Sequence, residues 1–312
     1  MKFLLQIANF LFVCHSVADA LTSNDLTNIG RKLGPVVRGT NMPTAVRLAF
    51  HDCVGGCDGC LNTDNPDNAG LADIVNNLET VYEDNGYSAL LSRADFWAYA
   101  AYSALDIALG NANTSCSGCM PELGLVFKSG RVDCDTSPTT TVDVGLPSSH
   151  LNYTGLISFF KDEFDFTADE TVALMGVHTL GSASTENSGF SGAWVQGGAR
   201  NLNNDYYKIM INSDNSWRQR DVSSDDTSPA IQWNAAGVGF MLNSDMAIYK
   251  EFTVDEDGNS SCTYDACPVS DSAELVEKFA ASNDDWIPAF AAVFTRMVEH
   301  VNDTIVLQDV TD

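Results

Sequence analysis

The sequence predicts one mainly α-helical domain with little β-structure. Apolar residues recur with helical spacing in several segments, two of these segments follow a capping box, and no repeat or long polar linker divides the 312 residues. Apolar residues make up 45% of the chain and charged residues 19%, which is typical of a packed globule and not of a disordered chain. We therefore expect a single domain over residues 21–312, arranged in two lobes.

The first expected helices lie in the N-terminal half. Pro43 suits the first turn of a helix that continues through Asp52. Apolar residues at positions 71, 74, 75, 78, 81 and 82 form one stripe of a second helix. Ser92 and Asp95 have the spacing of a capping box, so a third helix is predicted to begin there and to end near Leu109.

Two more helices are expected in the C-terminal half. Thr167 and Glu170 form a clearer capping box, and the helix that follows is predicted to run through His178 and to end at Gly181. Apolar residues at positions 290, 293, 294, 297 and 298 form a further helical stripe.

The charge balance restricts the partners of the protein. The chain has 16 Lys and Arg residues against 42 Asp and Glu residues, a net charge of −26. Such a field repels nucleic acids and anionic lipid surfaces, so neither is an expected partner. Neutral or cationic small molecules and metal cations remain compatible with it.

Residues 1–20 are predicted to be a signal peptide. Lys2 precedes an apolar run, and Ala18-Asp19-Ala20 has the small residues of a cleavage site. The alternative is a short buried helix, which fits an N-terminal run behind a lone basic residue less well. We expect a secreted, extracellular protein that begins near Leu21, with no later segment long enough to span a membrane.

The cysteines and the glycosylation sequons agree with export. Removal of Cys14 with the signal peptide leaves eight cysteines, an even set that suits an oxidising compartment. Their pairing cannot be deduced, although Cys262 and Cys267 are close enough to form a local pair. Four sequons fit a glycoprotein, but such short patterns also arise by chance. They begin at Asn113, Asn152, Asn259 and Asn302.

One expected helix carries an unusual group of side chains. Phe50 and His51 follow Arg47 by three and four residues, so the three side chains project from neighbouring parts of one face. Burying a guanidinium and an imidazole on an otherwise apolar helix is costly, which favours a functional role. An arginine with its head in solvent and a core histidine bonded to a carbonyl would explain the same residues. These three residues alone do not decide between the two.

Five segments together resemble the haem peroxidase superfamily of plants, fungi and bacteria. In chain order they are similar to its distal helix, its distal asparagine segment, its haem-edge proline, its proximal helix and its proximal aspartate segment. The resemblance covers nearly the whole mature chain, and it implies about ten helices in distal and proximal lobes with haem b between them. The segments are Arg47–Cys53, Asp67–Leu71, the Leu146-Pro147 turn, Met175–Gly181 and Leu242–Asp245.

The resemblance implies a role for each residue of these segments. His178 would bind the haem iron, and Asp245 would accept a hydrogen bond from its other ring nitrogen. His51 would take a proton from hydrogen peroxide and return it to the departing oxygen, with Asn68 fixing its tautomer. Arg47 would stabilise the negative charge that grows on that oxygen.

Other assignments keep a simpler alternative. Phe50 would keep the pocket dry, and the Pro147 carbonyl would contact the reducing substrate, although Pro147 could be an ordinary turn residue. Asp245 lies in a segment that also suits a turn or a helix cap. Trp194 resembles the proximal tryptophan of the ascorbate and cytochrome c peroxidases, where it could carry the oxidising radical or simply pack against His178.

Calcium is the second expected cofactor. Asp52, the Gly56 carbonyl and Asp58 match the family's distal calcium site, and oxygen ligands suit this cation. Cys60 stands where a Ser or Thr ligand is expected, and sulfur is a poor calcium ligand. A zinc site made of His51 and three cysteines is the rival, which oxidised cysteines would prevent. Thr179 matches a ligand of a proximal cation site, but Asn203 replaces the usual aspartate.

The donor is expected to be a small phenol or a similar reductant at the haem edge. Asn187 replaces the ascorbate-binding arginine, Thr40 and Thr44 replace the carboxylates of a manganese site, and Ala173 replaces a surface tryptophan of the lignin peroxidases. We expect a monomer that reacts with hydrogen peroxide. The alternative is a peroxidase-fold protein without activity that serves as an extracellular binding or matrix glycoprotein.

Overall fold

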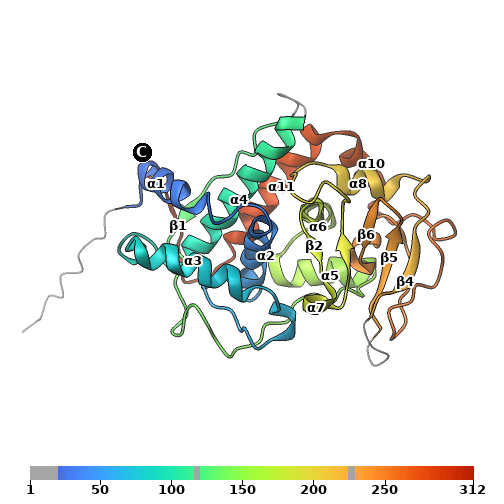
Figure 1. Cartoon of the computed structure of the whole chain (residues 1–312), viewed down its shortest axis with the longest axis horizontal. Coiled ribbons are helices and arrows are strands. Elements are labelled where there is room, and N and C mark those ends of the chain that lie inside the picture. The colour runs from blue at the N-terminus through green and yellow to red at the C-terminus, as the bar shows by residue number, and fades with distance from the viewer. Residues whose placement is uncertain (1–19, 116–119, 224–228) are drawn as a thin grey trace, which may run out of the picture.

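The computed structural model describes residues 20–115, 120–223 and 229–312 (Figure 1). The expected signal peptide, apart from its last residue, lies outside the described residues, as do Cys14, Cys116 and Cys119. The cleavage site therefore stays a prediction. In the part of the chain that is described, no helix is both long and apolar enough to cross a membrane.

One half of the molecule, on the left and centre of Figure 1, is built almost entirely from helices. The distal helix α2 packs against the long helix α4 and also contacts the C-terminal helix α11. The short strands β1 and β7 pair in an antiparallel manner beside them. The elements are α1 (Ser23–Leu33), α2 (Asn41–Cys53), η1 (Pro66–Asn68), α3 (Ala72–Asp84), η2 (Tyr87–Ala89), α4 (Arg93–Ser115), β1 (Lys128–Ser129), α11 (Asn283–Val298) and β7 (Gln308–Asp309).

The other half combines shorter helices with two small antiparallel sheets. Strands β2 and β3 pair with each other, and β5 lies between β4 and β6 in the second sheet. Ser182 is opposite Ala193 in the first sheet, and Trp233 is opposite Met241 in the second. The elements are α5 (Tyr153–Phe164), α6 (Ala168–Met175), η3 (Gly176–Thr179), β2 (Ser182–Ala183), α7 (Thr185–Ser188), β3 (Gly192–Ala193), α8 (Asp205–Ile211), β4 (Arg218–Asp221), β5 (Ile231–Ala235), β6 (Gly239–Met241), α9 (Asn243–Met246) and α10 (Ala273–Ala281).

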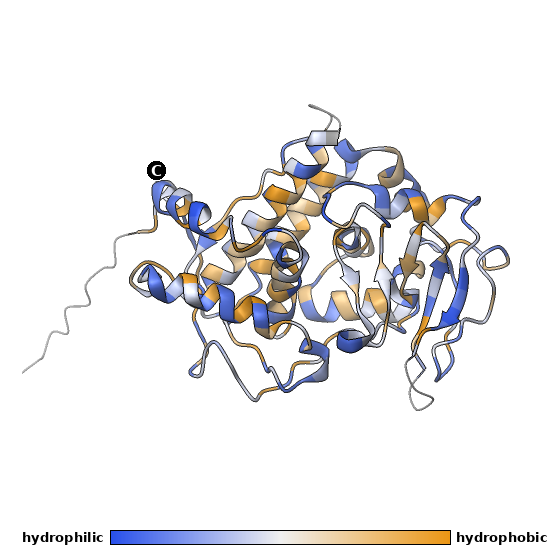
Figure 2. Cartoon of the chain, viewed as in Figure 1, coloured by the Kyte–Doolittle hydropathy of each residue, from blue (hydrophilic) through white to orange (hydrophobic). Residues whose placement is uncertain are grey.

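The predicted mainly α-helical fold is confirmed. Eleven α-helices occur in the described residues, and the strands are few and short. The helical interior is coloured apolar in Figure 2 where α4 and α11 cross the centre of the molecule. Large side chains of these two helices are fully buried there. They include Phe96, Trp97, Trp286, Phe290 and Phe294.

Two helix predictions need correction. The Thr167 capping box is present, but α6 ends at Met175 and His178 lies on the 3-10 helix η3. The Tyr207 hydroxyl and the Trp286 indole donate to the carbonyls of Val172 and Ala173, which a continuing α-helix would use for its own N–H groups. Helix α4 begins as predicted but continues to Ser115, six residues past the predicted end near Leu109.

The capping box predicted at Ser92 and Asp95 is only half formed. The Ser92 hydroxyl accepts the Asp95 N–H at 3.0 Å, as a cap does. The Asp95 carboxylate instead forms a buried ion pair with Arg131 at 2.7 Å and accepts the Gly130 N–H. A guanidinium that is buried needs such a partner, so tertiary pairing takes the carboxylate away from the local cap.

Three disulfides join cysteines of the described residues. The predicted pair Cys262–Cys267 is confirmed, and the two other bonds, which the sequence left open, are Cys53–Cys57 and Cys60–Cys134. Disulfides of this kind persist in oxidising compartments.

Candidate active site

The distal group is held by hydrogen bonds that leave His51 only one tautomer. The Asn68 amide donates to the Asn62 carbonyl at 2.8 Å, so its oxygen Oδ1 faces His51 Nδ1 at 2.7 Å. An oxygen can only accept, and therefore His51 carries its proton on Nδ1. The opposite nitrogen, Nε2, is then an acceptor, and it receives the Arg47 Nε–H at 3.2 Å.

Burial keeps this imidazole neutral. Desolvation, assisted by the positive charge of Arg47, lowers the pKa of His51 to about 3, and the hydrogen bond to Asn68 opposes the shift only weakly. His51 is therefore an unprotonated base at any physiological pH. Burial also lowers the pKa of Arg47, and the charge of Asp67 partly compensates.

The Arg47 guanidinium is fixed by two backbone carbonyls. It donates to the Ala69 carbonyl at 3.0 Å and to the Asp67 carbonyl at 2.6 Å. Both carbonyls flank Asn68, so one turn of chain positions the partners of Arg47 and His51 together. Phe50 lies edge-on to His51 at 5.8 Å between ring centroids and packs against the rings of Phe160 and Phe164. An aromatic wall thus borders the imidazole.

The proximal group is centred on the Asp245 carboxylate, which is fully buried. His178 Nδ1 lies 2.6 Å from its Oδ1, and the Trp194 indole donates to Oδ2 at 2.7 Å. Sequence reasoning missed two further donors. The Tyr206 hydroxyl donates to Oδ1 at 2.9 Å, and the Leu242 N–H donates to Oδ2 at 2.7 Å. Four donors compensate for burying the negative charge.

His178 presents an unused ring nitrogen. Its Nδ1 is taken by Asp245, its ring is stacked on Trp194 with centroids 4.4 Å apart, and its side chain is 30% exposed. No residue in the described ranges bonds to Nε2. A neutral histidine that donates Nδ1–H to a carboxylate while Nε2 stays free has the donor arrangement of a haem iron ligand.

The chain that follows η3 lies against the first turn of α2. Gly181, two residues after η3, has φ of +89°, and a Cβ at this position would lie 3.0 Å from the Pro43 side chain at the start of α2. Only glycine tolerates both the backbone conformation and the contact.

A family model described as peroxidase matches residues 23–282, most of the chain. The chain belongs to the haem peroxidase family. It is an enzyme that uses haem and acts on hydrogen peroxide together with a reducing substrate.

Relatives of this peroxidase include fungal proteins. It is 26% identical over 309 residues to the mitochondrial cytochrome c peroxidase of Candida glabrata, with 94% of this chain and 72% of the relative covered. It is also 25% identical over 274 residues to the "Putative heme-binding peroxidase" of Yarrowia lipolytica, with 84% of this chain and 78% of the relative covered.

Among the predicted site residues of this peroxidase, Pro147 has the weakest structural connection to the distal and proximal groups. It is partly exposed, and no hydrogen bond in the described residues joins its backbone to the groups of His51 or His178. Its loop is nevertheless anchored next to the proximal group, because the Ser244 N–H donates to the Ser149 carbonyl at 3.1 Å.

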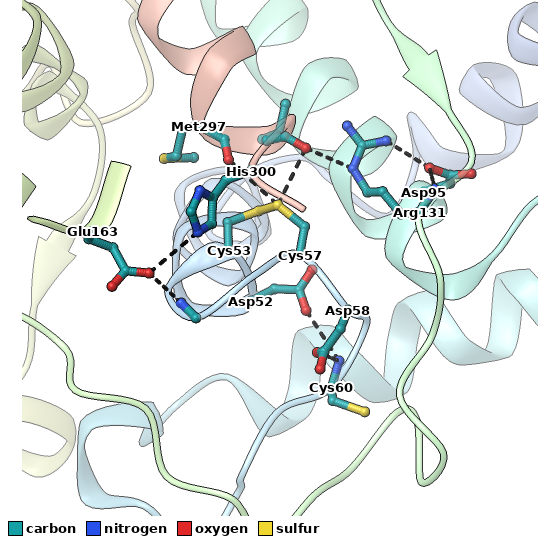
Figure 3. Close-up of a disulfide and its surroundings, with 12 residues drawn as sticks. Asp52, Cys53, Cys57, Asp58, Cys60, Asp95, Arg131, Glu163, Met297 and His300 are labelled. Atoms are coloured by element: carbon teal, nitrogen blue, oxygen red, sulfur yellow. Dashed lines mark hydrogen bonds and ion pairs between the residues drawn. A yellow bond between two sulfur atoms is a disulfide. The ribbon is translucent and has the colours of Figure 1, made fainter. Parts of the chain in front are cut away.

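The predicted calcium residues lie beside the first disulfide (Figure 3). The carboxylates of Asp52 and Asp58 converge on the Cys60 N–H, each at 3.2 Å. Burial and the neighbouring charge of Asp58 raise the pKa of Asp52 well above its usual range. Two carboxylates on one donor at a glycine turn are a donor set that suits calcium. No hydrogen bond in the described residues involves the Gly56 carbonyl.

The cysteines around this turn are not metal ligands. Cys53, Cys57 and Cys60 all form disulfides, so the rival zinc site is wrong, because zinc needs thiolates. Cys60 is bonded to Cys134, so its sulfur is not free to act as the calcium ligand expected at this position.

At the proposed proximal cation site, hydrogen bonds already use the expected ligands. The Thr179 hydroxyl donates to Asn203 Oδ1 at 3.1 Å, and the Asn203 amide donates to Asp205 at 2.9 Å.

Proposed function

We propose that the protein is a secreted peroxidase that oxidises small phenolic or similar donors by one-electron steps, with Arg47, His51 and Asn68 as its catalytic residues. The observation that carries this proposal is the pairing of a neutral His51, whose Nε2 is an acceptor, with a His178 whose Nε2 is unused.

The residues fit haem b. His178 Nε2 would bind the iron, and the Asp245 carboxylate would keep the ring oriented and electron-rich through Nδ1–H. Haem supplies, when bound, the electrons that reduce the O–O bond of hydrogen peroxide. Trp194 stacks on the same ring and shares the carboxylate, so it either packs the proximal side or carries the oxidising radical.

Proton transfer is the task of the distal group. Hydrogen peroxide would displace the Arg47 Nε–H from the lone pair of His51 Nε2, which then accepts the peroxide proton. His51 later donates this proton to the departing oxygen, and the low pKa that burial produces keeps it ready to accept. Asn68 holds the required tautomer throughout. Arg47 stabilises the negative charge on the departing oxygen in a site with little water. Phe50 excludes water from this side.

The donor and the setting of the enzyme belong to the same proposal. Small phenols would approach the haem edge near Pro147, since the chain has none of the specialised donor residues of other branches. Asp52, Gly56 and Asp58 would hold a calcium ion that relieves the repulsion of the two carboxylates. The disulfides support secretion as a glycoprotein, and we expect a monomer.

One spectroscopic and kinetic experiment tests the proposal. The secreted wild-type protein should show a ferric haem Soret band and oxidise a phenol only when hydrogen peroxide is added. His51→Leu should keep the haem and slow the peroxide reaction by about two to four orders of magnitude. His150→Leu, a matched variant away from the distal group, should react at the wild-type rate.

The alternative of an inactive binding or matrix glycoprotein predicts different results. Colourless protein that does not take up haem, or haem-loaded protein without phenol oxidation, would favour it. Unchanged peroxide rates in His51→Leu would refute the assignment of the base.

A further inference from the structure

A cavity lies outside the distal and proximal groups. It has a volume of about 500 Å³ and opens beside the sheet β4–β5–β6, on the right in Figure 1. Its lining includes Arg218, Arg220, Asn234, Phe240 and Gln196. Sites for small molecules have about this size, roughly 300–1,000 Å³, and combine apolar surface with a few polar groups.

Two arginines face this cavity from one side of β4. Residues 218 and 220 share a strand face, and Gln219 points the opposite way, where its amide donates to Asn243 at 2.8 Å. Both arginines are exposed, and neither forms an ion pair or a side-chain hydrogen bond with any residue that the structure describes. Figure 2 shows β4 as a hydrophilic strand.

The arginines reverse the charge of the protein locally. The chain carries a net charge of −26, yet this lining has two positive side chains against the single carboxylate of Asp214. A planar guanidinium offers paired N–H donors that match the two oxygens of a carboxylate. The cavity is therefore suited to a small organic monoanion.

The inner side of the cavity adjoins the proximal group through the one aromatic residue of its lining, Phe240. Phe240 is fully buried, and its ring lies 4.7 Å from the Trp194 ring, which in turn stacks on His178. Strand β6 approaches the backbone of Trp194 closely at Gly239. A Cβ at this position would lie 1.9 Å from the Trp194 carbonyl oxygen, so the approach needs a glycine. One ring thus separates the cavity from Trp194.

We propose that this cavity is a second donor site, which binds phenols that carry a carboxylate. Arg218 and Arg220 hold the carboxylate, and the phenol ring lies toward Phe240. The inference rests on the proposed oxidation of phenols and on Trp194 as the carrier of the oxidising radical. Each bound donor loses one electron toward Trp194 and releases its phenolic proton. Two donors give two phenoxyl radicals, and one hydrogen peroxide takes up the two electrons and two protons to become two waters.

Binding is tested first, with 4-hydroxybenzoate as the probe and calorimetry on the haem-loaded protein. The variant Arg218→Gln/Arg220→Gln should weaken binding at least about tenfold, because it removes the charged donors. Arg31→Gln/Lys32→Gln is the matched control, since it removes the same charge from exposed positions on α1 at the other end of the molecule (Figure 1). Equal affinity in wild type and the β4 variant, or an equal loss in the control, would overturn the proposal.

Kinetics then separates this site from the haem edge. With hydrogen peroxide as oxidant, the β4 variant should have a KM for 4-hydroxybenzoate raised about tenfold, while KM and kcat for uncharged phenol stay at wild-type values. Parallel changes for both donors would overturn the second donor site. If the wild type binds 4-hydroxybenzoate through the arginines but oxidises neither donor, the proposed function fails, and the calorimetry still supports the cavity as an anion-binding site.

Discussion

The neutral state of His51 makes an acid-sensitive contribution to stability. Burial lowers its pKa from 6.5 to about 3 in the folded protein, whereas the unfolded chain restores the ordinary value. Between these two pKa values the unfolded state binds one proton more than the folded state, so the free energy of unfolding falls as the pH decreases. The contribution is fully present above pH 6.5 and is lost progressively down to about pH 3.

The size of this effect follows from the shift. Each pH unit between the two pKa values is worth about 1.4 kcal/mol, so a decrease from pH 7 to pH 4.5 should cost roughly 2.5 kcal/mol through this residue alone. Because His51 is only partly buried by accessible surface, solvent screening makes this value an upper limit. His51→Gln keeps a polar side chain of similar length but cannot titrate, and it should lose this part of the pH dependence.

Denaturant unfolding of the haem-free protein at both pH values measures the difference directly. The variant His51→Gln should lose up to about 2.5 kcal/mol less than the wild type on acidification. Identical pH dependence in wild type and His51→Gln would refute the reasoning that burial keeps His51 neutral.

Three further outcomes are expected. Tyr206→Phe removes one of four hydrogen bonds to the buried Asp245 carboxylate and should lower the free energy of unfolding by about 1.5–3 kcal/mol, measured with denaturant; an unchanged value would contradict the importance of this donor. If Trp194 carries the oxidising radical, freeze-quenched EPR of the peroxide-treated enzyme should lose its signal in Trp194→Phe, and a persisting signal would exclude this role. Chelation of calcium should lower the Tm of the wild type but not that of Asp58→Asn, and equal shifts would argue against a site at Asp52 and Asp58.

Local patterns in the sequence predicted much of the fold. The stripe at 71–82 corresponds to α3, and the apolar positions from 290 to 298 correspond to α11. The Thr167 cap marks the start of α6 correctly, because a capping box depends only on residues three apart. The end of α6 was missed because Tyr207 and Trp286, which come from other helices, engage its last carbonyls.

The site was predicted less completely than the fold. Spacing within α2 placed Arg47 and His51 on one face, and the structure brings them within hydrogen-bond distance. Resemblance suggested Asn68 and Asp245, which indeed contact the two histidines. Tyr206 was not found, because no local pattern in residues 201–210 indicates that its hydroxyl contacts Asp245. The arginines of β4 were not recognised either, because strand alternation alone does not reveal a cavity.

The sequence by itself determined which side chains are available and which of them share a helix face, since helical periodicity and caps depend on near neighbours. Tertiary structure alone decided how these side chains ionise and pair. His51 becomes a neutral base because folding buries it beside Arg47 and Asn68, and Asp95 leaves its local cap because a buried Arg131 requires a counter-charge. Desolvation depends on everything that packs around a group, and that environment comes from residues far apart along the chain.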